Sequence, residues 1–215
     1  MEKRILLFDL DGTLTDSGEG IINCGQIVLQ HYGLPVPSRQ DMRCMVGPPL
    51  RESFPRFGIQ PEDVDDAIEL YRRHYNNGGI FQNSPYPGIH ALLEKLQLEG
   101  YLLCVATSKP ENMAKIILEH FNMDRYFHRI CGASSDYQRF TKSQVIAYLM
   151  NQLHNTDRLL MVGDTIYDVE GAAEFHIPTI GVSWGYGNVD EMKAGGAVAI
   201  VNTMRELYEA IKANE

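Results

Sequence analysis

The hydrophobic positions of this chain change their spacing twice along its length. An apolar run at residues 5–8 predicts a short buried strand. From residue 85 onward, short apolar runs alternate with amphipathic stretches. Strands are expected at residues 101–106, 130–133, 158–162, 179–182 and 198–201. This alternation predicts an α/β fold with a doubly wound, mostly parallel sheet, which binds its ligands outside the carboxyl ends of the strands.

Residues 17–84 show helical periodicity alone. Apolar side chains recur at intervals of three or four residues in two stretches, at positions 21, 24, 28 and 32 and at positions 64, 68, 71 and 75. The first stretch follows Asp16, and the second ends before Gly78. We therefore predict a core of residues 1–16 and 85–215, interrupted by an all-helical cap of residues 17–84.

Charge and composition exclude several classes of protein. The formal net charge of -9 leaves no basic surface for a phosphate backbone, so no nucleic acid polymer is expected as a partner. No window approaches the ~20 apolar residues of a membrane span, so no membrane partner is expected either. The cysteines, at positions 24, 44, 104 and 131, lack zinc-ligand spacing. A cytoplasmic location is expected, and the sequence is compatible with a monomer or a homodimer.

Two carboxylates follow the first apolar run directly. Asp9 and Asp11 share one face of an extended chain, and Gly12 allows the backbone to turn away from the strand. At a separation of about 4 Å two such charges repel by roughly 4 kcal/mol at an effective dielectric near 20, so a cation or a shared proton should offset them. A simple surface turn is the alternative. An EF-hand is excluded, because its sixth and twelfth positions hold Leu14 and Gly20.

Polar residues also follow the later predicted strands. Thr107 and Ser108 come after the second strand, Lys142 after the third and Asp164 after the fourth. The carboxyl ends of parallel strands meet at one edge of a sheet, so all four are expected to face one crevice together with the N-terminal carboxylates.

These residues resemble the motifs of the haloacid dehalogenase-like (HAD) superfamily of phosphohydrolases over essentially the whole chain. The first motif looks like residues 9–13, the second like Thr107, the third like Lys142 and the fourth like residues 163–168. The helical insertion after the first motif is similar to the cap of the phosphoglycolate phosphatase-like branch. The Trp-Gly-Tyr-Gly stretch at residues 184–187 also looks like that branch, and we interpret its Gly-Tyr-Gly part as a flexible turn.

The resemblance implies a phosphatase that acts on a small phosphorylated metabolite through an aspartyl-phosphate. Asp9 would attack phosphorus, and Asp11 would protonate the leaving oxygen and then take a proton from water. Lys142 and Thr107 would stabilise the equatorial oxygens, so they count as catalytic and as substrate-binding residues. Ser108 and the cap residue Arg43 complete the expected substrate-binding set.

The expected cofactor is Mg²⁺, whose preference for hard oxygen ligands suits carboxylates. The metal-binding set is Asp9, Asp164, the backbone carbonyl of Asp11, and Asp168. Asp168 is expected either in the outer shell of the metal or in a position that orients Lys142.

Several alternatives stay open at this point. Residues 141–144 depart from the family's usual third motif, which makes Lys109 a rival of Lys142 as the phosphate-binding lysine. Arg43 would clamp a second anionic group of the substrate or would simply be solvated. Tyr71 and Tyr75 are interpreted as cap core, with a substrate platform as the alternative.

The substrate is expected to be of the 2-phosphoglycolate or the nucleoside 5'-monophosphate type. A phosphosugar mutase of the same superfamily is the enzymatic alternative, although such mutases usually lack an acid at the position of Asp168. A catalytically idle binding protein on the same fold is the remaining alternative, which the intact carboxylates at positions 9, 11 and 164 disfavour.

Overall fold

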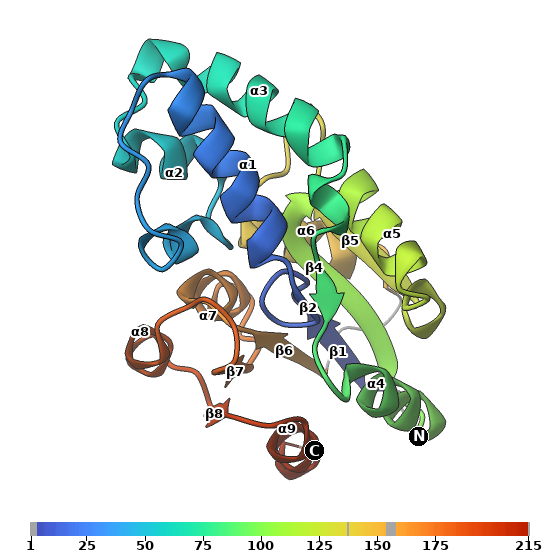
Figure 1. Cartoon of the computed structure of the whole chain (residues 1–215). Coiled ribbons are helices and arrows are strands. Elements are labelled where there is room, and N and C mark those ends of the chain that lie inside the picture. The colour runs from blue at the N-terminus through green and yellow to red at the C-terminus, as the bar shows by residue number, and fades with distance from the viewer. Residues whose placement is uncertain (1–3, 137, 154–157, 215) are drawn as a thin grey trace.

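The centre of the molecule is a six-stranded parallel sheet (Figure 1). The computed structural model describes residues 4–136, 138–153 and 158–214. The sheet order is β5-β4-β1-β6-β7-β8, which confirms the predicted α/β fold. The strands are β1 (Ile5–Phe8), β4 (Leu102–Pro110), β5 (Arg129–Ala133), β6 (Leu159–Gly163), β7 (Thr179–Val182) and β8 (Ala199–Val201).

Helices cover both faces of this sheet. Leu6 and Phe8 of β1 belong to one hydrophobic cluster, whereas Ile5 and Leu7 belong to the other, so the strand is buried on both sides. This explains its unbroken apolar run, which is typical of parallel sheets. The first face packs against α4 (Ile89–Leu98), α5 (Glu111–His120) and α9 (Met204–Ala213). The second face packs against α6 (Lys142–Met150) and α7 (Ile166–Ala173). Helix α8 (Val189–Ala194) lies beside β7 and β8.

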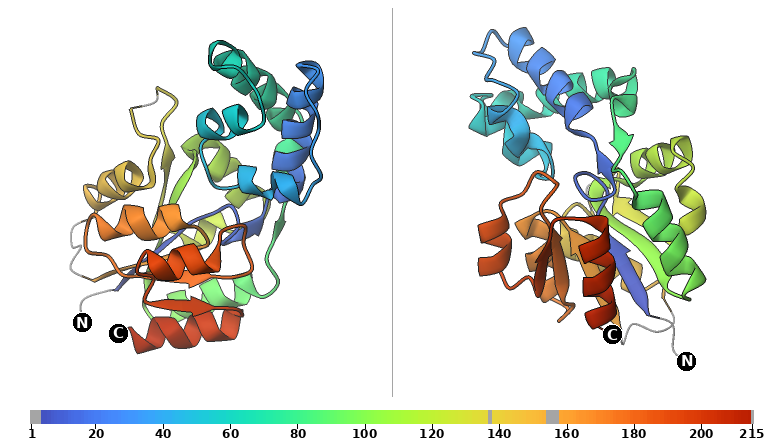
Figure 2. Two further views of the ribbon diagram at one scale, coloured as in Figure 1. Left: turned by 90° about the vertical axis from the view of Figure 1, so that its left-hand side faces the viewer. Right: turned by 60° about the horizontal axis from the view of Figure 1, so that its bottom comes forward.

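A second group of helices stands beyond the carboxyl ends of the strands (Figures 1 and 2). The chain leaves the sheet through β2 (Thr15–Asp16) and returns through β3 (Ser84–Pro85), which pair antiparallel. Between them lie α1 (Gly18–His31), α2 (Leu50–Arg56) and α3 (Val64–Asn76), with short 3-10 helices at Asp41–Met45, Pro61–Asp63 and Gly79–Phe81. The predicted cap boundaries at residues 16 and 85 fall in these two strands. The division into two domains stays a prediction.

Local chemistry shifts two element boundaries from their predicted places. Strand β4 continues to Pro110, which caps α5 in an extended conformation, so the strand runs four residues beyond the predicted 101–106. Helix α7 begins at Ile166, ahead of the apolar pattern, because the backbone N–H of Thr165 donates to Asp168 Oδ2 over 3.1 Å and caps the first turn. Both shifts bring polar groups to the edge of the sheet.

The strand order reverses around β1. From β1 the chain continues to β4 and β5 on one side, and then crosses to β6, β7 and β8 on the other. In doubly wound sheets such a reversal leaves a crevice at the carboxyl ends of the two strands that flank it, here β1 and β6. Among the described residues, none of the helices is long and apolar enough to cross a membrane.

Candidate active site

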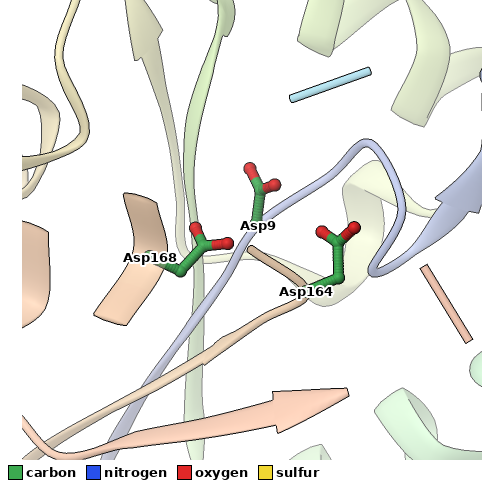
Figure 3. Close-up of side chains that lie close together, drawn as sticks. All are labelled: Asp9, Asp164 and Asp168. Atoms are coloured by element: carbon green, nitrogen blue, oxygen red, sulfur yellow. The ribbon is translucent and has the colours of Figure 1, made fainter. Parts of the chain in front are cut away.

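Three carboxylates gather at the carboxyl ends of β1 and β6. Asp9 follows β1, Asp164 follows the neighbouring strand β6, and Asp168 lies in the first turn of α7. Each offers an oxygen that lies within 4.8 Å of an oxygen of the other two, and all three residues are buried. Figure 3 shows the carboxylates converging from these three segments. The sequence predicted this group, and the reversal of strand order explains its location.

Asp164 is held in place from two sides. Its Oδ1 accepts a hydrogen bond from the Thr13 hydroxyl at 3.1 Å, and its Oδ2 accepts one from the backbone N–H of Tyr186 at 2.8 Å. Both neighbouring loops approach so closely that only glycine fits. A Cβ on Gly12, whose φ is +88°, or on Gly185 would lie 2.2 Å from Asp164 Oδ2. The orientation of Asp164 therefore depends on both loops.

Lys142 lies between two of the three carboxylates. Its Nζ is 2.7 Å from Asp9 Oδ1 and 2.7 Å from Asp168 Oδ1, and it donates a third contact of 2.9 Å to the carbonyl oxygen of Ala106. The lysine is 5% exposed, so little solvent competes for its charge. The contact of Asp168 with Lys142 is the geometry needed for the second of its two predicted roles, which is to orient Lys142.

The start of α6 explains how Lys142 reaches this place. Lys142 is the first residue of the helix, and Thr141 caps it by accepting from the backbone N–H of Gln144 at 3.2 Å. The backbone N–H of Thr141 donates in return to Gln144 Oε1 at 3.2 Å. The opposing helix α7 presents Gly171, where a Cβ would lie 2.7 Å from Lys142 Cβ. Residues 141–144, which depart from the family's usual third motif, thus cap the N-terminus of α6.

Burial and like charges shift the titration of these groups. Burial raises the pKa of Asp9 to about 6, against the opposing effect of Lys142. Burial, followed by the charges of Asp168 and Asp9, raises the pKa of Asp164 well above its ordinary value. Burial alone lowers the pKa of Lys142, but its ion pairs with Asp168 and Asp9 outweigh this effect and raise it. The cluster carries more negative charge than one lysine neutralises.

A second buried lysine, Lys109, pairs with the other predicted acid. Its Nζ donates to both oxygens of Asp11, at 2.8 and 3.1 Å, and lies 4.8 Å from the ring centroid of Tyr75. Lys109 is in β4, Asp11 follows β1, and Tyr75 is in α3, so this contact connects the sheet with the second group of helices. The two lysines that the sequence left as rivals therefore occupy neighbouring sites with different partners.

The carboxylate cluster fits a magnesium ion. Its donors are hard oxygen atoms, and a dication would offset the burial and the mutual repulsion that raise the pKa of Asp9 and Asp164. Asp168 is less available, because Lys142 approaches one of its oxygens and Thr165 donates to the other from its backbone N–H and its hydroxyl. Asp9 and Asp164 are thus the side chains best placed to hold the ion, and the carboxylate of Asp11 is committed to Lys109.

Two adjoining cavities open at this edge. The smaller, of about 20 Å³, is lined by Asp9, Asp11, Gly47, Thr107, Ser108, Lys109, Lys142, Thr165 and Tyr167. The larger, of about 480 Å³, shares with it Asp11, Gly47, Ser108 and Lys109. Nearly all the predicted catalytic and substrate-binding residues therefore face one space, and Thr107 and Ser108 lie beside the two lysines.

Arg43 lies apart from this group. Its guanidinium donates to the carbonyl oxygen of Gly185 at 2.9 Å and lies 4.6 Å from the ring centroid of Tyr186. The ring is itself anchored, since the Tyr186 hydroxyl contacts Asp16 and accepts from the backbone N–H of Gly18. Arg43 lines neither of the two cavities described above. Arg43 connects the 3-10 helix Asp41–Met45 with the loop at residues 184–187 and lines a separate cavity of about 350 Å³, so its role as a substrate clamp stays a prediction.

The sequence alone did not identify three contacts of the site. The backbone N–H of Tyr186 holds Asp164, although the Gly-Tyr-Gly stretch was expected to be a flexible turn. Thr13 is the second anchor of Asp164, and Tyr75 is the aromatic neighbour of Lys109. The resemblance of residues 184–187 to one family branch was the available signal for the first contact. Nothing local identifies the other two, because their partners are distant in sequence.

Comparison with known proteins gives a consistent assignment. Residues 6–182 match the family model described as haloacid dehalogenase-like hydrolase. A tyrosine-protein kinase PtkA from Mycobacterium tuberculosis is 41% identical over 97% of this chain and 72% of its own length. A 5'-nucleotidase from Pseudomonas aeruginosa is 37% identical over 88% of this chain and 86% of its own length.

Solved structures extend the likeness to three dimensions. A predicted phosphatase from Clostridium acetobutylicum superposes with a TM-score of 0.94 at 42% identity, and the match covers 99% of this chain and all of that one. Two of these three names give different activities, tyrosine-protein kinase and 5'-nucleotidase, and the third gives no substrate, so the match identifies the family and leaves the substrate open.

Proposed function

This chain belongs to the haloacid dehalogenase-like hydrolase family, and from this premise we propose that it hydrolyses a small phosphomonoester in a Mg²⁺-dependent reaction through an aspartyl-phosphate on Asp9. The enzyme is a phosphoric monoester hydrolase by class. The observation that carries the proposal is the buried contact of Asp9 with Lys142 beside Asp164, at the crevice between β1 and β6. We also propose that residues 17–84 form the cap of this phosphatase.

In the first step, a carboxylate oxygen of Asp9 bonds to phosphorus while the ester bond to the leaving oxygen breaks. Lys142 Nζ, 2.7 Å from Asp9 Oδ1, is placed to meet the negative charge of the transferring group, and the Thr107 hydroxyl lines the same small cavity. When bound at Asp9 and Asp164, Mg²⁺ would neutralise phosphate charge and keep the two anions together. Burial keeps water from competing with these contacts.

Asp11 moves the proton in both steps. It donates a proton to the leaving oxygen in the first step. In the second, it takes a proton from a water molecule whose oxygen bonds to phosphorus, and the acyl-phosphate bond breaks to release inorganic phosphate and restore Asp9. Both oxygens of Asp11 accept from Lys109 in this structure, so the Lys109 contact must loosen before Asp11 carries a proton.

A phosphate-release assay tests the proposal. The purified protein is incubated with 2-phosphoglycolate, nucleoside monophosphates, sugar phosphates, phosphotyrosine and pyrophosphate, with Mg²⁺ and with a chelator. We expect release from at least one phosphomonoester with Mg²⁺, without any added sugar bisphosphate, and loss of release with the chelator. Release that requires a sugar bisphosphate would indicate the mutase alternative. No turnover of any compound would indicate the idle binding protein.

Phosphoryl transfer to tyrosine is a second candidate, because one relative carries the name tyrosine-protein kinase. Asp9 would take the γ-phosphoryl group of ATP and release ADP. A phenol oxygen in place of water would then bond to phosphorus, passing its proton to Asp11, while the acyl-phosphate bond breaks and restores Asp9. Labelled ATP and a tyrosine-containing peptide distinguish the two reactions. Label that appears as free phosphate supports hydrolysis, whereas label on the peptide supports transfer.

A further inference from the structure

The larger cavity lies between the sheet edge and the predicted cap. At about 480 Å³ it falls within the roughly 300–1,000 Å³ typical of pockets that enclose drug-sized ligands. It shares Asp11, Ser108 and Lys109 with the small cavity that contains Asp9 and Lys142. A phosphate group that reaches Asp9 would therefore point its leaving group past Asp11 into the larger cavity.

The part of the cavity wall that α3 contributes is mainly aromatic and apolar, and the charged residues Arg51, Glu52 and Arg72 line the cavity as well. Tyr71 and Tyr75 of α3 stack with ring centroids 5.5 Å apart and an interplanar angle of 14°, and both are buried. The same wall contains the buried Ile68 of α3, and Met113 of α5 contributes from the core side. Phe140, which is 43% exposed, lies at the cavity as well. The tyrosine pair expected to be cap core thus also faces the site.

These walls suit a leaving group with a large apolar surface. Burial of apolar area contributes roughly 25 cal/mol per Å², and flat rings pack well against stacked tyrosines and a methionine. A two-carbon acid such as glycolate offers almost no apolar area, so it would leave the apolar walls at Ile68 and Met113 uncovered. Arg43, which was expected to meet such a second anion, points instead to Gly185.

We propose that the leaving group of the substrate carries an aromatic ring, which lies in the cavity between Tyr71 and Met113 while the phosphate lies at Asp9. The inference rests on the proposed phosphatase function and narrows its substrate class. It favours nucleoside monophosphates and other ring-bearing phosphomonoesters over 2-phosphoglycolate. The shared chemistry is the ring, whether it is a nucleobase or a phenyl group.

Matched substrate pairs test the ring without changing the leaving oxygen. Adenosine 5'-monophosphate carries a base where ribose 5-phosphate carries a hydroxyl group, and benzyl phosphate carries a phenyl ring where ethyl phosphate carries a methyl group. We expect the ring to raise kcat/KM at least about tenfold in one of the pairs, mainly through KM, since differences of this size are common for apolar pockets. The pair that shows the effect identifies the kind of ring.

A variant that fills the cavity gives an independent measure. Leu50 is a half-buried lining residue at the start of α2, so Leu50→Trp should reduce the preference for the ring at least about fivefold. Leu98→Trp is the matched control, because Leu98 is 84% exposed on α4 and lines neither cavity. We expect Leu98→Trp to keep the wild-type preference. Circular dichroism and thermal unfolding check that both variants are folded.

The outcomes separate this inference from the function on which it rests. Hydrolysis with equal kcat/KM for both members of each pair, or a faster reaction of 2-phosphoglycolate than of every ring-bearing ester, overturns the inference and leaves the phosphatase proposal standing. An unchanged ring preference in Leu50→Trp overturns the placement in this cavity. No hydrolysis of any ester overturns the phosphatase proposal itself.

Discussion

Lys142 and Lys109 are both buried at the same edge of the sheet, and each contacts a carboxylate of the first motif, yet their surroundings differ. Lys142 contacts Asp9 and Asp168, both of which belong to the sheet and its covering helices. Lys109 joins Asp11 to the ring of Tyr75, which lies in α3. The position of Lys142 therefore depends on core residues alone, whereas the position of Lys109 also depends on where the helical segment lies.

This difference suggests that the two lysines have different roles. A lysine surrounded by core groups keeps its position wherever the helical segment lies, which suits a group proposed to meet the transferring phosphate. A lysine that holds Asp11 and contacts α3 is suited to couple Asp11, the proposed proton-transferring acid, to the presence of a substrate under the proposed cap. Burial alone lowers the pKa of both lysines, but their acidic neighbours, together with Tyr75 in the case of Lys109, raise it above the ordinary value, so both carry their charge in this structure.

Removing the nucleophile should have the largest effect on the Lys142 side. We expect Asp9→Asn to reduce kcat by about 10⁴-fold or more, because an amide cannot form the acyl-phosphate, while the fold is retained. Steady-state phosphate release checks this. Asp190→Asn, at an exposed side chain of α8, is the matched control and should keep wild-type activity. Near-normal turnover by purified Asp9→Asn would refute the covalent mechanism.

Removing Lys142 should have the second-largest effect. Lys142→Met leaves Asp9 and Asp168 buried without their shared cation, so we expect a loss of about 3–5 kcal/mol in the free energy of unfolding. We also expect kcat to fall by about 10²–10³-fold. Urea unfolding and phosphate release measure the two effects. Lys142→Met/Asp168→Asn should regain part of the stability and none of the activity. Equal stability of wild type and Lys142→Met would contradict the ion pairs of Lys142 with Asp9 and Asp168.

The metal should stabilise the protein in a pH-dependent manner. The pKa of Asp9 is about 6 in the fold, against 3.8 ordinarily, so without metal the contribution of Asp9 to stability falls as the pH rises from about 4 to 6. Mg²⁺ requires the ionised carboxylate, so its stabilising effect should grow from pH 5 to pH 7.5. At 100 times its Kd the ion would add about 2.7 kcal/mol.

Thermal unfolding with Mg²⁺ and with chelator measures this effect without any substrate. Asp9→Asn serves as the control, because it lacks both the titrating group and one charged ligand. Its Mg²⁺-dependent shift in Tm should be smaller and should vary less with pH. A shift of equal size at pH 5 and pH 7.5 in the wild type would argue against a site at Asp9.

The smallest expected effect concerns the contact of Lys109 with Tyr75 of α3. A double-mutant cycle of Lys109→Met and Tyr75→Leu should show a coupling energy of about 0.5–2 kcal/mol in stability, the range of cation–π contacts. The corresponding cycle of Lys142→Met and Tyr75→Leu should be additive within about 0.5 kcal/mol, because those side chains share no partner. Equal coupling in both cycles would remove the distinction between the two lysines.

Much of the site was predictable because its parts are local in sequence. The buried strand β1, the carboxylates of Asp9 and Asp11 and the turn at Gly12 lie within eight consecutive residues, from Ile5 to Gly12. The carboxyl end of each predicted parallel strand marked where a polar residue should face the crevice, which is how Asp164 was found. Apolar spacing and motif order thus determined the fold class and the positions of the candidate carboxylates, whose catalytic role stays a prediction.

Only the tertiary structure decided which charges meet. Motif order favoured Lys142 and left Lys109 as its rival, because nothing local tells which of two lysines after different strands will reach Asp9. The capping of α6 and the crossing from β5 to β6 made that choice. The same holds for Arg43, since its contact with Gly185 joins residues 142 positions apart. Periodicity depends on neighbours along the chain, whereas ion pairs and cavities depend on distances across it.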